Sequence, residues 1–304
     1  MFGWRKPRRE SADVAVIVSY ASMESAFLPV VIEQCQRFSR HIVVTQGDRL
    51  FPTVAGAQSE REDPPTLPAD VLYVRYPVDV DATDGLEGVR RRPTAYLHNV
   101  ARWTGISTLR EHLGSEADHL WVLLLDGDEV PDGDRVARWL AAAGPGLDRG
   151  TAYKMANYWH YADVRLRART WEDSVVLVHM SVVRDRRAVF GDKERDHIVR
   201  AAAGCERRVV GDDGRPLFSH FSWCRSQRGL RQKLELWAHR DDKFKGRPVD
   251  DLVERVLSAS RGDIHREAAR LRDIVHGYEY DVVEGDAIVE RLHAAIAELD
   301  RLGL

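Results

Sequence analysis

The sequence contains few cysteines. Its 304 residues include Cys35, Cys205 and Cys224, which are widely spaced and form no C-x-x-C pair. This spacing provides neither a disulfide framework nor a zinc site, and it is typical of proteins in a reducing cytosol. We therefore expect a cytoplasmic protein. At this length the chain can bury a large core, either as one α/β domain or as a domain with a helical appendage.

Long hydrophobic runs are also missing. The longest apolar runs, residues 14–18 and 121–125, have the length of a strand rather than of a membrane span. The first ten residues are basic, but no apolar segment with a small-residue cleavage site follows them. The sequence therefore predicts no transmembrane segment and no signal peptide.

Charge of one sign is not in excess. The formal net charge is −3, whereas a chain-wide nucleic-acid surface requires a basic domain. Arginines nevertheless cluster at residues 90–92 and 225–231, and phosphate contacts dominate the affinity of proteins for DNA. A nucleic-acid partner therefore stays open, although most arginine clusters of this kind lie on solvated faces.

Hydrophobic periodicity is clear in the first half of the chain. An apolar strand at 14–18, a helix at about 24–38 and a strand at 42–45 form a βαβ unit, whose parallel strands require the crossover helix. A proline-rich loop at 52–69 follows, and then come a strand at 71–76, a helix from Pro93 to Gly114, a strand at 120–125 and a helix at about 134–143.

The second half changes character. Residues 152–161 and 175–183 are strand-like, 189–200 are polar and irregular, 216–223 read Pro-Leu-Phe-Ser-His-Phe-Ser-Trp, and helical patterns occupy 228–240 and, as two helices, 250–303. We predict an α/β fold in which helices flank a mixed, mostly parallel sheet. A basic tail, residues 1–12, would precede the α/β domain, residues 13–226, and a helical extension, residues 227–304, would pack on that domain.

An acidic turn follows the most apolar strand. Asp126, Asp128 and Glu129 come directly after residues 120–125, at the strand end where open α/β sheets bind ligands. Three carboxylates so close together repel one another, and proteins commonly offset such repulsion by binding a divalent cation. The alternative is a solvated turn in which Asp132 or Asp134 caps the next helix. This segment alone does not decide between the two.

The order of these features resembles a GT-A glycosyltransferase of the family-2-like bacterial type. The resemblance covers about residues 13–242, and it rests on a helix with Asn99, Arg102 and Gly105, on a D-x-D motif at Asp126-Gly127-Asp128, and on the late His220. It implies a GT-A fold, Rossmann-like, for the α/β domain. It also implies an enzyme, a hexosyl- or pentosyltransferase.

The resemblance further implies a metal-dependent donor site. A divalent cation, Mn²⁺ or Mg²⁺, would neutralise the diphosphate of a nucleotide sugar. Asp128 would be its direct ligand, with Asp126 reaching the metal, its water or the ribose, and His220 as a further ligand or else a core histidine. The remaining residues expected to contact the donor are Ser19, Tyr20 and Asp48 near the base, Arg102 near the diphosphate, and Gly127 in the motif itself.

A base for the acceptor hydroxyl is expected in the irregular segment before residue 200. Asp192, Glu194 and Asp196 are its carboxylates, and the sequence does not choose among them. The aromatic side chains Tyr158, Trp159, His160 and Trp171 would suit an acceptor wall, although aromatic core is the commoner explanation.

These features favour transfer of a sugar from a nucleotide-diphosphate sugar, UDP being the favoured nucleotide, to a hydroxyl acceptor. The acceptor could be a glycan, a lipid, a small molecule or a hydroxymethylated DNA base. One alternative is a nucleotidyltransferase, but the segment after the first strand, Tyr-Ala-Ser-Met-Glu-Ser, lacks the glycines and lysine of its usual loop. Another is a binding module that holds a metal ion without nucleotide.

Overall fold

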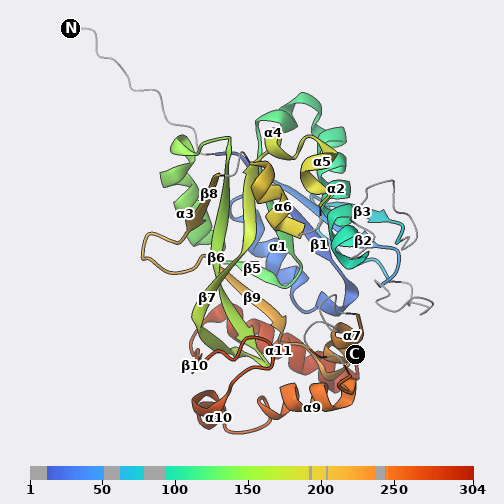
Figure 1. Cartoon of the computed structure of the whole chain (residues 1–304), viewed down its shortest axis with the longest axis vertical. Coiled ribbons are helices and arrows are strands. Elements are labelled where there is room, and N and C mark those ends of the chain that lie inside the picture. The colour runs from blue at the N-terminus through green and yellow to red at the C-terminus, as the bar shows by residue number, and fades with distance from the viewer. Residues whose placement is uncertain are drawn as a thin grey trace.

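A mixed sheet with helices on both faces forms the body of the protein (Figure 1). The computed structural model describes residues 12–50, 62–78, 93–191, 194–202, 205–236, 244 and 246–304. The α/β fold with a mixed, mostly parallel sheet that the sequence predicts is confirmed.

The first half of the sheet is parallel. It contains β1 (Val14–Tyr20), β2 (His41–Gly47), β3 (Leu72–Tyr76) and β4 (Trp121–Asp126), in the order β3-β2-β1-β4. β1 and β2 pair in parallel, and the helix α1 (Leu28–Gln36) forms the crossover connection between them. Every residue of β1 is buried, as expected for a continuous apolar run with helices on both sides.

The second half of the sheet is largely antiparallel. It contains β5 (Glu129–Pro131), β6 (Thr151–Tyr161), β7 (Asp163–His179) and β9 (Phe218–Trp223), in the order β4-β7-β6-β9-β5, while β8 (Cys205–Val209) and β10 (Tyr280–Val282) pair with β6 and β7. After β4 the chain rejoins the sheet at β5, which pairs with β9. The acidic turn therefore lies between the two halves.

The helices cover the two faces of the sheet unequally. One face packs against α1 and α3 (Gly133–Ala143), and the other against α2 (Pro93–Leu113), α4 (Met180–Val183), α5 (Arg186–Val189) and α6 (Glu194–Ala201). Short 3₁₀ turns lie at Ser22–Glu24, Gly114–His119 and Gly144–Gly146. In the described part of the chain no helix, the 21-residue α2 included, has the length and apolarity needed to cross a membrane.

The C-terminal part packs on the lower end of the sheet in Figure 1. It contains α7 (Gln227–Leu236), α9 (Val249–Ser258), α10 (Ile264–Arg270), β10 and α11 (Ala287–Leu302). A third hydrophobic cluster joins Trp223 of β9 to Leu230 of α7, Val256 of α9 and Tyr280 of β10. The sequence predicts helices alone for residues 250–303, so β10, which extends the sheet beside β7, is an addition.

Three local expectations differ from the structure. Residues 189–200 are predicted to be irregular, but α6 forms there because Ile198 and Val199 are buried against the sheet. The strand predicted at 175–183 begins twelve residues earlier, at Asp163, and ends at His179, whose side chain caps α4. The helix predicted at 228–240 ends at Leu236, and residues 237–243 lie outside the described part.

Gly105 of α2 offers a test of how closely this helix packs on the sheet. A Cβ atom at residue 105 would press into Ile17 Cγ2 of β1 and would lie 3.0 Å from Thr45 Cγ2 of β2. We expect Gly105→Ala to lower the free energy of unfolding by about 1–3 kcal/mol through overpacking, although alanine has the higher helix propensity. Urea denaturation measures this.

Gly229→Ala in α7 is the matched control. Its Cβ would meet Ser226 Oγ at 3.3 Å and Arg225 Cβ at 3.5 Å, which a small adjustment relieves. We expect this variant to be at least as stable as the unsubstituted protein, by up to about 1 kcal/mol. Equal stability of the two variants would contradict close packing at Gly105.

Candidate active site

The acidic turn between β4 and β5 is tightly built. Gly127 donates its backbone N–H to the carbonyl of Ser19, at 2.8 Å. A Cβ atom at residue 127 would collide with the carboxylate of Glu24, so a larger residue there would displace that side chain. The turn therefore brings the end of β4 against the segment that follows β1.

Asp126 is held by two arginines from different helices. Arg102 of α2 lies 3.2 Å from its Oδ1, and Arg195 of α6 lies 3.0 Å from its Oδ2. Burial raises the pKa of Asp126, but the charges of Arg195 and then Arg102 outweigh this and hold the pKa at about 2. Asp126 is therefore ionised, and each of its two oxygens has a cationic partner in the protein.

Glu129 is fully buried and fixes Arg195. Its Oε2 accepts from Arg195 Nη1 at 2.6 Å and from the backbone N–H of Asp126 at 2.9 Å, while Oε1 accepts from Ser174 Oγ at 2.5 Å. Because both oxygens are occupied, Glu129 orients α6 relative to the turn.

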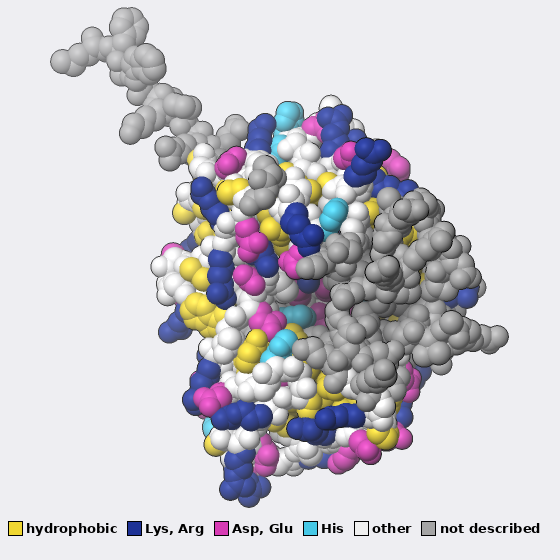
Figure 2. Space-filling view, viewed as in Figure 1, with side chains coloured by type: hydrophobic (Ala, Val, Ile, Leu, Met, Phe, Trp, Pro, Cys, Tyr) yellow, Lys and Arg dark blue, Asp and Glu magenta, His cyan; other side chains and the backbone are white. Residues whose placement is uncertain are grey.

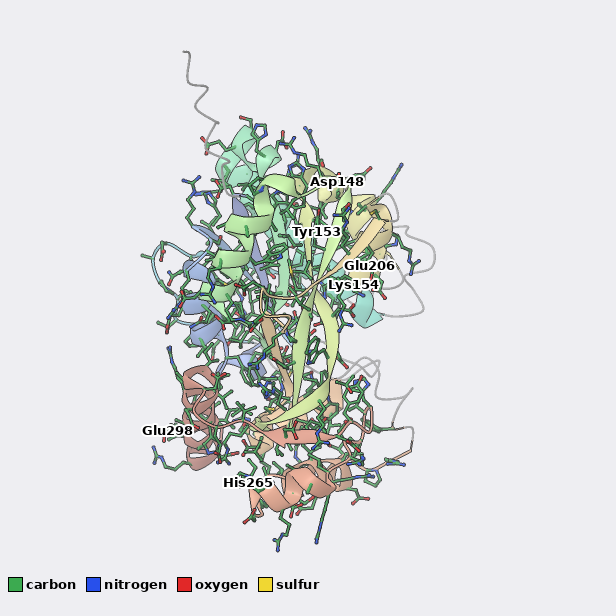
Figure 3. All side chains as sticks on the ribbon, turned by 90° about the vertical axis from the view of Figure 1, so that its left-hand side faces the viewer. Asp148, Tyr153, Lys154, Glu206, His265 and Glu298 are labelled. Carbon is green, nitrogen blue, oxygen red and sulfur yellow. The ribbon has the colours of Figure 1, made fainter. Side chains whose placement is uncertain are left out.

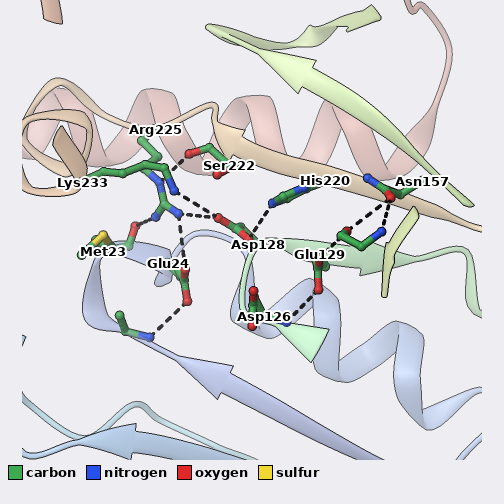
Figure 4. Close-up of polar contacts among 12 residues, drawn as sticks. Met23, Glu24, Asp126, Asp128, Glu129, Asn157, His220, Ser222, Arg225 and Lys233 are labelled. Carbon is green, nitrogen blue, oxygen red and sulfur yellow. Dashed lines mark hydrogen bonds and ion pairs between the residues drawn. The ribbon is translucent and has the colours of Figure 1, made fainter. Parts of the chain in front are cut away.

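Asp128 lies at the centre of a second group of cations (Figure 4). Its Oδ2 accepts from Arg225 Nη2 at 2.5 Å and lies 4.0 Å from Lys233 Nζ, and its Oδ1 lies 3.4 Å from His220 Nε2. Burial would raise the pKa of the Asp128 carboxyl, but His220, Arg225 and Lys233 hold it well below its ordinary value. The same contact to Asp128 outweighs burial at His220 and raises the pKa of that imidazole.

Glu24 completes this group from the opposite side. It lies 3.3 Å from Arg225 Nη2, and it accepts the backbone N–H of Ala21 at 3.1 Å. Burial, and next the charge of Asp128, raise the pKa of Glu24 to about 8. Burial and the charge of Arg225 lower the pKa of Lys233 to about 8. At neutral pH Glu24 is therefore mostly protonated.

This arrangement limits where a metal ion fits. In the described part of the chain no group of three or more His, Cys, Asp or Glu side chains could hold a metal ion. The separation of 3.4 Å between His220 Nε2 and Asp128 Oδ1 is compatible with one ion bound by both atoms, at the distances of about 2.0–2.2 Å usual for such ligands. Asp126 faces Arg102 and Arg195 instead. Asp128 and His220 could therefore supply two ligands to an ion, and ligand oxygens or water would have to supply the others.

The residues expected near the nucleotide base lie at the ends of β1 and β2. Ser19 pairs with Asp126 across the sheet, and its buried hydroxyl has no hydrogen-bond partner among the described residues. Tyr20 is buried, and burial raises its pKa. Asp48 accepts the backbone N–H of Val78 at 2.9 Å. Only Ser19 of these three therefore adjoins the acidic turn directly, and their role in donor binding stays a prediction.

The residues expected to act as the base lie apart from the turn where they are described. Asp192 and the side chain of Glu194 lie outside the described part. Asp196 is exposed and lies 3.6 Å from Lys154 Nζ, which also contacts Asp173 and Glu206 (Figure 3). The residue of α6 that reaches the acidic turn is Arg195, so the structure offers no support for Asp196 as the base.

The predicted aromatic wall is divided between the two faces of β6. Trp159 packs edge-on against His220, with ring centroids 4.9 Å apart, on the side of the acidic turn. Tyr158 and His160 line a cavity of about 60 Å³ with residues of α11, on the other side. Trp171 contacts Tyr158 there. Side-chain alternation along a strand produces this division.

Several residues of the site are missing from the sequence prediction. They are the cations Arg195, Arg225 and Lys233 and the buried carboxylates Glu24 and Glu62. Glu62 accepts from the backbone and hydroxyl of Ser22, both at 2.8 Å, and from Gln46 Nε2 at 3.0 Å. The run of basic residues after the Ser-His-Phe-Ser-Trp segment indicates that cations could lie at the site. The sequence does not show which of these side chains are buried.

Comparisons with known proteins give little further information. No protein-family model matches the sequence, and no curated protein matches it. Among solved structures, the chain is similar to a glycosyltransferase involved in the glycosylation of the major capsid of PBCV-1, with 13% identity, a TM-score of 0.36, and coverage of 73% of this chain and 98% of that one. It is also similar to the glycosyltransferase GlyE of Streptococcus pneumoniae TIGR4, with 10% identity, a TM-score of 0.32, and coverage of 82% and 64%.

Both TM-scores are below 0.5. Likeness at this level does not establish a common fold or function. The case for an activity therefore rests on the residues of the site.

Arg225 allows a test of the buried charges. Replacing it with methionine keeps much of the side-chain volume but leaves Asp128 without its closest cation. We expect Arg225→Met to lower the free energy of unfolding by about 3–5 kcal/mol, because an uncompensated buried charge is strongly destabilising. Arg231→Met is the control, since Arg231 pairs with Asp250 at the exposed surface and should change stability by less than about 0.5 kcal/mol. Similar losses in both variants would contradict the buried network.

Glu24 gives a pH-dependent test. Its folded-state pKa of about 8 exceeds the ordinary value of 4.5, so its protonated form stabilises the fold below pH 4.5 and that contribution is lost as the pH rises through 8. We expect Glu24→Gln to gain stability relative to the unsubstituted protein between pH 5 and 9, as measured by denaturation.

The control for this experiment is Glu298→Gln, in α11. Arg301 lowers the pKa of Glu298, so that carboxyl is ionised in both the folded and the unfolded chain above pH 6. Its variant should show no trend from pH 6 to 9. A constant stability difference between Glu24→Gln and the unsubstituted protein would show that Glu24 is ionised throughout.

Proposed function

We propose that this protein transfers a sugar from a nucleotide-diphosphate sugar, with UDP as the favoured nucleotide, to a hydroxyl acceptor. The observation that carries the proposal is the convergence of Arg102, Arg195, Arg225 and Lys233 on Asp126 and Asp128 at the end of β4. A diphosphate leaving group carries the charge that such a set of cations can neutralise. The resemblance of the D-x-D segment to GT-A glycosyltransferases supports the same reaction.

The charge balance of the site supports an anionic ligand. Glu24 is mostly protonated at neutral pH, because its pKa is about 8, while Asp126 is ionised. Four cations, Arg102, Arg195, Arg225 and Lys233, then lie around Asp126 and Asp128. A diphosphate would add negative charge beside these cations, and Lys233, which approaches the turn from the C-terminal side, is the residue proposed to bind it.

Metal dependence is part of the proposal. Asp128 and His220 would hold a Mn²⁺ or Mg²⁺ ion whose other ligands come from the diphosphate and water, as Mg²⁺ usually binds in nucleotide sites. When bound, the ion would act as a Lewis acid on the diphosphate oxygens. The roles proposed for the chain are that Arg102 and Arg195 keep Asp126 ionised and in place, and that Arg225 orients Asp128.

Thermal unfolding with a panel of nucleoside diphosphates tests the proposal. UDP, GDP, dTDP, CDP and ADP would each be added with Mn²⁺ or with a chelator. A ligand present at a hundred times its dissociation constant stabilises the fold by about 2.7 kcal/mol. We expect one diphosphate to do so in the presence of Mn²⁺, because its charge completes the site. Asp128→Asn should abolish the shift, whereas Asp134→Asn, whose side chain is exposed beside Arg37, should keep it.

The other outcomes separate the alternatives. A shift that survives the chelator would remove the metal from the proposal and leave the cations as the diphosphate site. Stabilisation by nucleoside triphosphates in preference to diphosphates would favour a nucleotidyltransferase. Stabilisation by Ca²⁺ alone would favour a binding module, and no shift with any diphosphate would refute the proposal.

A further inference from the structure

One face of the sheet continues from the acidic turn toward the C-terminal part of the chain. Glu129 of β5 pairs with His220 of β9, and His220 pairs with Trp159 of β6. Side chains of directly paired residues lie on the same face. Ser174 of β7 bonds to Glu129 and also to Asn157 of β6, at 3.3 Å, so β7 contributes to the same face.

The open part of this face lies below α6. Figure 2 shows acidic and histidine side chains around a hollow in the middle of the molecule. His220 and Glu172 are partly exposed, with 14% and 21% of their side chains accessible, while Trp159 beside His220 is buried. The indole N–H of Trp159 has no hydrogen-bond partner among the described residues. Trp159 therefore forms a buried support between the partly exposed side chains of His220 and His276.

The segment between α10 and β10 reaches this face. Asp273 is buried and accepts the backbone N–H groups of Val275, His276 and Tyr278, at 2.8, 2.5 and 2.8 Å, and the hydroxyl of Tyr280 at 2.9 Å. Tyr280 itself belongs to β10, which pairs with β7. The backbone of this segment is therefore fixed at the turn around Asp273 and at β10. These two contacts fix the position of His276.

His276 lies beside Trp159 on this face. Its ring is perpendicular to the indole, with centroids 5.0 Å apart, and stacks on Tyr278 with centroids 4.9 Å apart. His276 Nε2 lies 3.4 Å from Glu172 Oε1, which also accepts the Tyr278 hydroxyl at 3.3 Å. Among the described residues the polar contact of the His276 ring is made by Nε2, not by Nδ1, and 29% of the side chain is exposed.

We propose that His276, oriented by Glu172, is the general base that accepts the proton of the acceptor hydroxyl. The inference rests on the proposed sugar transfer. Trp159 separates His276 from His220 and Asp128, so a sugar whose diphosphate is bound at Asp128 would extend across Trp159 toward His276. The negative charge of Glu172, 3.4 Å from Nε2, favours the imidazole tautomer with the proton on Nε2 and leaves Nδ1 as the base.

The chemical step balances with these groups. The acceptor oxygen forms a bond to the anomeric carbon, and the bond from that carbon to the diphosphate oxygen breaks. Its electron pair leaves with the diphosphate, which Lys233 would bind. The acceptor proton passes to Nδ1 of His276. General-base catalysis of this kind contributes about 10²–10⁴-fold to the rate.

Release of UDP from UDP-sugars, with water as the acceptor, tests the inference. UDP-glucose, UDP-galactose and UDP-N-acetylglucosamine would be used, together with the corresponding GDP- and dTDP-sugars. We expect His276→Ala to lower the turnover number by at least about 10²-fold, with the dissociation constant for the free nucleoside diphosphate unchanged. Added imidazole should restore part of the turnover, and Glu172→Gln should cause a smaller loss.

His265→Ala is the matched control. His265 belongs to the same C-terminal part, but it is exposed and contacts Glu284 at the far end of the molecule (Figure 3). Its variant should behave as the unsubstituted protein does. Turnover of His276→Ala within about threefold of that protein would overturn the inference. A loss that is accompanied by weaker nucleotide binding and is not restored by imidazole would also overturn it, because His276 would then be structural.

Failure of the proposed function gives a different result. In that case the unsubstituted protein would neither bind a nucleoside diphosphate nor release one from a donor, before any variant is compared. That outcome refutes sugar transfer and with it the base. Activity of the unsubstituted protein that is independent of His276 refutes the base alone.

Discussion

The burial of Asp128 and Glu129, with the partly buried Asp126 beside them at the end of β4, is the constraint on which the arrangement of the site depends. Buried charges destabilise a protein unless partners of opposite charge are fixed beside them. Here the partners are Arg102 of α2, Arg195 of α6, and Arg225 of the segment between β9 and α7. The turn therefore connects helices on one face of the sheet with the C-terminal part, and its ion pairs help to hold these elements in one position.

The parts of the structure that the sequence predicts are those encoded locally. The apolar runs at 14–18 and 120–125 are buried on both sides, and they identify central strands without any knowledge of their neighbours. The acidic residues that follow β4 identify the strand end where the site lies. Two features set this site apart in the sequence: the position of Asp126 and Asp128 after a buried strand, and the isolated His220, which the structure places 3.4 Å from Asp128.

The parts that the sequence does not predict depend on contacts between distant segments. Arg225 lies 97 residues from Asp128 along the chain, and its neighbours include arginines that are exposed, so composition alone does not distinguish a buried cation from a solvated one. The helix α6 is polar apart from Ile198 and Val199, and so short an apolar pair does not show helical periodicity. His276 is fixed by Asp273 through backbone N–H groups, and such bonds leave no pattern in the sequence.

The same ion pairs determine what a ligand must do when it binds. The Oδ2 atom of Asp128 accepts from Arg225 at 2.5 Å, so a cation that approached this carboxylate would compete with the guanidinium, and a diphosphate that bound the guanidinium would compete with the carboxylate. An ion and a diphosphate that arrive together satisfy both partners, because each takes the group that the other releases. Opposite charges bound as a pair therefore fit this site better than either charge alone. This property is the physical basis of our proposal that the turn between β4 and β5 binds a metal-bound diphosphate rather than a metal ion by itself.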